Sequence, residues 1–118
     1  MKGFFSATGS LVLLLIGSGP VLASNLVAEG RQDAMLECAA CHRVTLRQTQ
    51  PASVPDPDEG RAVTAPAFDV IAGRYAGRPR ALRAFVQAPR HPMREQQFLR
   101  RDLTAISRYI ASLQGQRW

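Results

Sequence analysis

The sequence predicts a small all-α domain of about four helices. Apolar residues recur at helical spacing in several segments, most clearly at Leu99, Leu103, Ile106, Ile110 and Leu113. No segment shows the apolar–polar alternation of a strand over a useful length. A length of 118 residues is typical of one globular domain. Apolar residues make up 46% of the chain, which is more than a disordered tail contains.

The first 23 residues have the parts of a secretory signal peptide. Lys2 supplies a positive charge, residues 11–16 form an apolar run, and Val-Leu-Ala at 21–23 supplies a cleavage pattern. We expect cleavage after Ala23, export to the periplasm, and a single domain over residues 24–118. The alternative is an uncleaved membrane anchor, but glycine, serine and threonine interrupt the run of about 20 apolar residues that a spanning helix needs.

The first helix of the exported chain is predicted over residues 26–37. Ser24 or Asn25 can cap its start, and the Gly-Ser-Gly-Pro sequence at residues 17–20 is expected to break any helix before it. Residues 43–65 are rich in proline and acidic side chains, and this composition predicts a long loop.

Prolines delimit the helices that follow. The second helix is expected to begin just after Pro66, and the third to run from near Pro79 to before Pro89. The fourth covers residues 99–113, and Gly115 is its expected C-terminal cap.

The pentapeptide Cys38-Ala39-Ala40-Cys41-His42 contains the only two cysteines of the chain and has the C-x-x-C-H pattern of c-type haem attachment. Two thiols about one helical turn apart can add to the two vinyl groups of the haem, and the adjacent imidazole can bind the iron. The motif therefore predicts one haem c, covalently attached through Cys38 and Cys41, with His42 as an iron ligand.

Three other interpretations of these cysteines are weaker. A thioredoxin-like site needs a βαβ context, which is missing around Cys38. A structural zinc site needs four ligands, and Cys38, Cys41, His42 and His91 form an awkward tetrahedral set because two of them are adjacent. A disulfide across two intervening residues is strained.

Two candidates for the second iron ligand lie close together, at His91 and Met93. Met93 follows Pro92 and precedes the final helix, and a thioether raises the reduction potential relative to a second histidine. We favour Met93, and His91 is the competing ligand, which would give a lower-potential site.

The chain resembles the class I c-type cytochromes. The resemblance lies in the C-x-x-C-H motif at 38–42, Ala-Pro-Ala-Phe at 65–68, His-Pro-Met at 91–93, and the final helix over 103–113. It implies a small cytochrome c-like fold of about four helices around one covalently bound haem, with the first and last helices crossing.

The resemblance also implies roles for single residues. Gly30 corresponds to the small residue at the helix crossing, and Ile106 and Tyr109 to residues that pack there. Pro66 corresponds to the proline whose carbonyl accepts a hydrogen bond from the proximal imidazole, here that of His42. Such a contact orients the ring and raises its basicity as a ligand.

The function implied is that of a monohaem electron carrier, not an enzyme, with His42 and Met93 as iron ligands. Its partners would be other redox proteins, such as a membrane oxidase, a bc-type complex or a dehydrogenase. The alternative is a five-coordinate or bis-histidine haem protein that acts as a peroxidase-like enzyme or a gas sensor. Two departures from the family are Arg43, where glycine is common, and the long loop at 43–65.

Charge indicates how partners would bind. Without residues 1–23 the chain has 14 arginines, no lysine and 9 acidic residues, a net charge of +5. Residues 24–72 carry a net charge of −3, whereas residues 73–118 carry +8. The basic C-terminal half predicts docking on acidic surfaces of partner proteins. Export, few aromatic residues and the lack of a recognisable motif argue against nucleic acid as the partner.

Three aromatic residues, Phe68, Tyr75 and Phe85, are expected to form core and pocket wall without a chemical role. Trp118, at the extreme C-terminus, is expected to be frayed.

Overall fold

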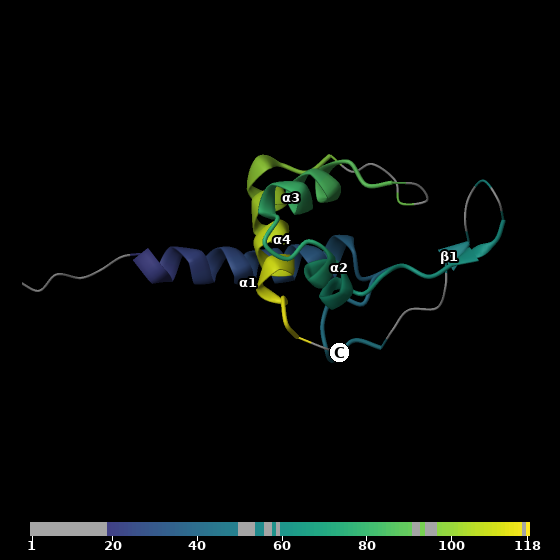
Figure 1. Cartoon of the computed structure of the whole chain (residues 1–118), viewed down its shortest axis with the longest axis horizontal. Helices are drawn as coiled ribbons and strands as arrows, with labels where there is room; N and C mark the ends of the chain where they lie inside the picture. The colour runs from purple at the N-terminus through teal and green to yellow at the C-terminus, as the bar shows by residue number, and fades with distance from the viewer. Residues whose placement is uncertain are drawn as a thin grey trace, which may run out of the picture.

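The structure is a computed structural model that describes residues 19–49, 54–55, 58, 60–90, 93, 97–116 and 118. Its described part contains four helices, as predicted, and is all-α apart from one very short strand pair (Figure 1). The helices are α1 (Gly19–Glu37), α2 (Phe68–Arg74), α3 (Pro79–Gln87) and α4 (Arg100–Ser112).

Helix α1 begins at Gly19, earlier than the predicted start at residue 26. Of the Gly-Ser-Gly-Pro sequence at 17–20 that was expected to break a helix, Gly19 and Pro20 lie in α1, because proline is tolerated in the first turn, where its missing N–H would have no partner; residues 17 and 18 lie outside the described residues. Ser24 and Asn25 consequently lie inside the helix and do not cap it. Cleavage after Ala23 stays a prediction. Among the described residues, no helix combines the length and apolarity that crossing a membrane requires.

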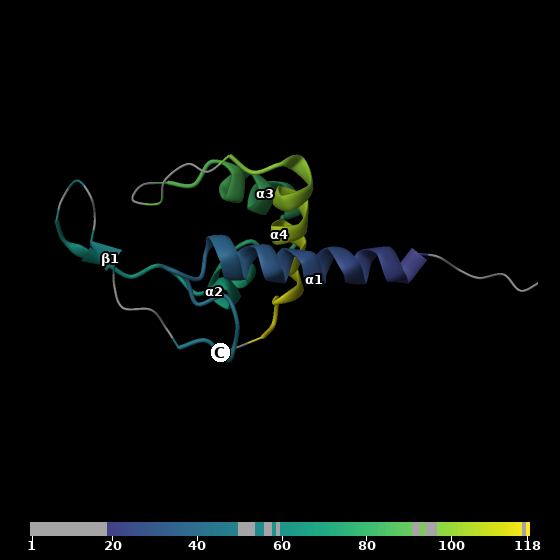
Figure 2. The ribbon, with the colours of Figure 1, turned by 180° about the vertical axis from the view of Figure 1, so that it is seen from behind.

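Helices α1 and α4 cross each other, as the two opposite views show (Figures 1 and 2). Gly30 lies at the crossing and is buried. A Cβ atom at Gly30 would overlap the main-chain carbonyl of Ala105 and come too close to the amide nitrogen of Ile106. The two helix backbones can therefore approach this closely only because residue 30 has no side chain.

Helix α4 is the centre of the core. Both α2 and α3 pack against it, in addition to α1. Its buried side chains recur every three or four residues, which is the spacing that predicted the helix. They are Leu103, Ala105, Ile106, Tyr109 and Ile110. The other helices contribute Phe68, Ile71, Ala72, Leu82 and Val86.

The predicted boundaries of the last three helices agree closely with the structure. Helix α2 begins two residues after Pro66, and α3 begins at Pro79 and ends two residues before Pro89. After α4 the chain turns at Gly115, whose φ of +82° lies in the left-handed region that glycine adopts without strain.

The loop between α1 and α2 contains two strands of two residues each, β1 (Val54–Pro55) and β2 (Ala62–Val63), paired antiparallel. The pair lies apart from the helices in both views (Figures 1 and 2). The sequence does not predict this pair, since two residues are too short to show an alternation.

The C-terminal residue Trp118 packs against the core, and the expectation that it frays is wrong. The Arg43 guanidinium lies over its ring, 5.7 Å from the centroid. The backbone N–H of Trp118 also lies 3.4 Å from Oδ2 of Asp69. The physical reason is that burial of a large aromatic ring against the core contributes more favourable free energy than the ordering of the chain end costs in conformational entropy.

Candidate functional site

An apolar cleft lies between the C-x-x-C-H motif and helices α2, α3 and α4. It brings together Cys38, His42 and Met93, which are predicted site residues from distant parts of the chain. The remaining wall is aromatic or aliphatic and consists of Phe68, Ile71, Phe85, Val86, Phe98, Ile106 and Ile110.

His42 is held in a defined orientation at the wall of this cleft. The side chain is 8% exposed, and its Nδ1 lies 2.7 Å from the carbonyl oxygen of Pro66. The Phe68 ring packs against the imidazole with 5.6 Å between centroids. Because Nδ1–H donates to Pro66, Nε2 is the nitrogen left free to bind a metal. The resemblance implied this contact between His42 and Pro66, and the contact is present.

Cys38 lies immediately after the end of α1, where its N–H donates to the Ala34 carbonyl at 2.9 Å. Burial, with smaller contributions from Glu37 and Asp33, raises the pKa of the Cys38 thiol to about 11. The thiol is therefore uncharged at neutral pH, which is the opposite of the lowered pKa that supports thiolate redox chemistry. Cys41 is partly exposed, and neither cysteine forms a disulfide.

Met93 is half-buried, and its N–H donates to the Arg90 carbonyl at 3.2 Å. The structure thus places the favoured second ligand at the cleft that His42 lines. The competing ligand, His91, lies outside the described residues. Within the part of the chain that the structure describes, no three His, Cys, Asp or Glu side chains cluster in an arrangement that could hold a metal ion.

The aromatic residues divide into two groups. Phe68 and Phe85 line the cleft, as expected, whereas Tyr75 stacks on Phe85 at 5.2 Å between centroids. Phe98 also lines the cleft, although nothing in the sequence assigned it to the site. Its signal was weak, since it is a single aromatic residue in the segment that joins Met93 to α4.

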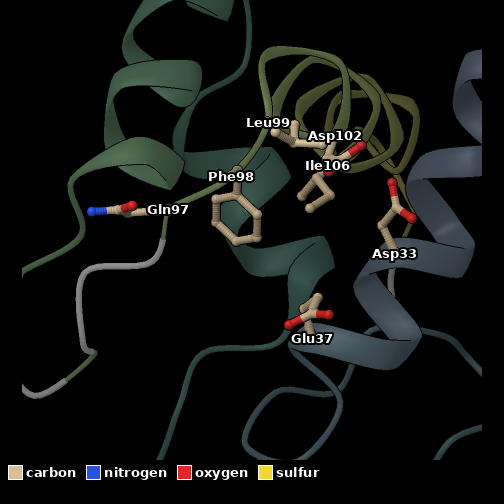
Figure 3. A pocket seen from close by; sticks show the side chains of 7 residues that line it. All are labelled: Asp33, Glu37, Gln97, Phe98, Leu99, Asp102 and Ile106. Atoms are coloured by element: carbon tan, nitrogen blue, oxygen red, sulfur yellow. The ribbon is translucent and has the colours of Figure 1, made fainter.

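A second hollow, of about 380 Å³, adjoins the cleft and shares Phe98 and Ile106 with it (Figure 3). Asp33 on α1 and Asp102 on α4 point toward one another across it, and Glu37 also lines it. Burial, followed by repulsion from Asp102 and other carboxylates, raises the pKa of Asp33. Three carboxylate side chains therefore line the hollow beside the cleft, although the C-terminal half of the chain carries a net positive charge.

The cleft suits the haem that the motif predicts. Its apolar lining fits the large flat ring of a haem. An imidazole nitrogen from His42 and a thioether sulfur from Met93 are both ligands of haem iron. Cys38 at the wall supplies one of the two thiols for covalent attachment.

Comparison with known proteins gives one match. The family model described as cytochrome c matches residues 27–114, which covers the C-x-x-C-H motif, Pro66 and Met93. No curated protein and no solved structure matches the chain.

Proposed function

Because this chain belongs to the cytochrome c family, we propose that it carries single electrons in the periplasm on one haem c whose iron is bound by His42 and Met93. The family carries electrons on covalently attached haem c, and Cys38 and Cys41 have the spacing that attachment requires. The observation that carries the proposal is the cleft that Cys38, His42 and Met93 line together.

The chain's own residues perform three tasks in this proposal. When bound, haem supplies one-electron chemistry at its iron. Pro66 holds the His42 imidazole through Nδ1, so that Nε2 is presented in one direction. The apolar wall excludes water from the ring, and burial of this kind is one of the factors that set the reduction potential.

Electron transfer is favoured over catalysis by the nature of the cleft. His42 and Met93 would both bind the iron, and no coordination position would then be left for a substrate. Among the described lining residues, His42 is the only imidazole and none carries a carboxyl group, and the Nδ1 of His42 is bound to Pro66. A peroxidase-like enzyme or gas sensor would need Met93 not to bind the iron.

Two features of the chain support the proposed location and partners. A signal peptide over residues 1–23 would direct export, so the protein would function in the periplasm. Exposed arginines on α3 and α4 would contact acidic surfaces on a membrane oxidase, a bc-type complex or a dehydrogenase. They include Arg80, Arg100 and Arg108. Arg101 contributes less because it is paired with Glu29 at 2.7 Å.

The ligands are tested by expressing the full chain together with haem-attachment machinery and recording oxidised and reduced spectra. We expect a reduced c-type α-band and a methionine-to-ferric-iron charge-transfer band. The charge-transfer band should disappear in Met93→Ala and persist in His91→Ala. The mass of the purified protein should correspond to residues 24–118 plus one haem.

Three results would each contradict a part of the proposal. Persistence of the charge-transfer band in Met93→Ala would exclude Met93 as the ligand. Rapid binding of carbon monoxide to the native protein would show an open coordination position and favour the enzyme or sensor. A mass that includes residues 1–23 would show that the signal peptide is not cleaved and would favour the membrane-anchored alternative.

A further inference from the structure

Gln48 lies in the long loop after the C-x-x-C-H motif and uses its whole side-chain amide in hydrogen bonds. Its Oε1 accepts from the N–H of Val44, and its Nε2 donates to the carbonyls of Ala39 and His42, each at 2.9 Å. Both amide hydrogens are thus engaged, as is the oxygen. This partly buried residue therefore bridges the first and last parts of the motif.

The two carbonyls that Gln48 binds need a donor. Helix α1 ends at Glu37, and in the turn that follows the Cys38 carbonyl accepts from the N–H groups of Cys41 and His42, at 3.2 and 2.9 Å. Within the described residues, the carbonyls of Ala39 and His42 receive no such main-chain bond. Carbonyls at a helix end lack intrahelical partners, and a side-chain donor is one of the ways to satisfy them.

The segment from which Gln48 reaches the motif is itself fixed to the core. The Tyr109 hydroxyl on α4 donates to the Val44 carbonyl at 2.5 Å. The Phe68 N–H at the start of α2 donates to the Arg43 carbonyl at 3.0 Å. Val44 is fully buried. Gln48 therefore connects the motif to a segment that both α2 and α4 hold in place.

We propose that Gln48 is a positioning residue for His42: its amide fixes the main chain at His42 while Pro66 fixes the imidazole, and the two together set the direction of Nε2. This inference rests on the proposed function, in which His42 binds the iron. Without Gln48, two carbonyls lose their donor and the peptide at His42 can rotate. The imidazole would then bind the iron in a changed or variable orientation.

The test compares Gln48→Leu with Gln87→Leu, the same change at an exposed position on α3, in haem-loaded protein. The readouts are the ferric electron paramagnetic resonance spectrum, the proton NMR shifts of the haem methyl groups, and the reduction potential. All three depend on the orientation and bonding of the axial imidazole. We expect shifted or broadened signals and a changed potential in Gln48→Leu, and wild-type values in Gln87→Leu.

A second variant covers the case in which Gln48→Leu does not fold. Gln48→Glu keeps the acceptor for Val44 and loses both donors at neutral pH, so the haem methyl shifts should change in the same way. Wild-type spectra in a variant whose melting temperature falls would show a merely structural role and overturn the inference. If the wild-type protein itself lacks the signature of histidine-bound low-spin iron, the proposed function fails instead.

Discussion

Replacement of Gly30 by alanine tests the helix crossing on which the site depends. Helix α1 ends one residue before Cys38, so the position of this helix against α4 determines where the motif enters the core. An added Cβ would meet the carbonyl carbon and oxygen of Ala105 and the nitrogen of Ile106. All three are main-chain atoms and cannot rotate away, so the two helices must separate.

The magnitude follows from two opposing effects. Alanine is favoured over glycine inside a helix by about 0.8–1 kcal/mol. Overpacking of a tight contact costs about 1–3 kcal/mol. Because the neighbours of Gly30 are rigid main-chain atoms, we place the cost of this substitution in the upper part of that range. We expect a net loss of about 1–2 kcal/mol in the free energy of unfolding.

Gly73 supplies the matched control, because it lies in α2 and a Cβ there meets no atom within 4 Å. Gly73→Ala should stabilise the protein by about 0.5–1 kcal/mol, so the two variants change stability in opposite directions. The assay is urea unfolding of the haem-loaded protein, followed by circular dichroism. If Gly30→Ala proves as stable as Gly73→Ala, the close approach of α1 and α4 at this position is incorrect.

Two further predictions concern single hydrogen-bonding groups. Tyr109→Phe removes the hydroxyl that donates to the buried Val44 carbonyl and should lower the free energy of unfolding by about 1–3 kcal/mol; an unchanged urea midpoint would refute this bond. Hydrogen bonding from Arg101 lowers the pKa of Glu29 below its ordinary value of 4.5. The stabilisation from this pair is therefore fully present above pH 4.5 and is lost as the pH falls through the lowered pKa. Unfolding of Glu29→Gln measured across this range should differ from wild type at neutral pH, least at high salt, and converge with it in acid; a difference that persists at low pH would contradict the assignment.

Local patterns account for most of what could be predicted. The spacing of apolar residues in α4 repeats every three or four positions, so its buried face could be predicted without any partner. Pro79 marks the start of α3 because its missing N–H is harmless there. By contrast, the start of α1 was predicted seven residues too late, since the chain tolerates Gly19 and Pro20 in a first turn.

The candidate site shows the same division. The C-x-x-C-H motif could be interpreted directly because five adjacent residues carry its chemistry. The role of Gln48 could not, because a glutamine in a proline-rich loop has no periodic signal and its partners depend on the path of that loop. The acidic hollow was likewise hidden, since Asp33 and Asp102 belong to helices at opposite ends of the chain.

Sequence alone was sufficient for the helical class, the haem-attachment motif and the basic excess of the C-terminal half, because each depends on neighbouring residues or on composition. Only the tertiary structure shows that Met93 lies at the same cleft as His42, that Pro66 holds the imidazole, and that carboxylates line the hollow beside this cleft. These are contacts between residues that are far apart in the chain. They form only when α1 crosses α4 at Gly30, and the resulting packing brings distant side chains to one place.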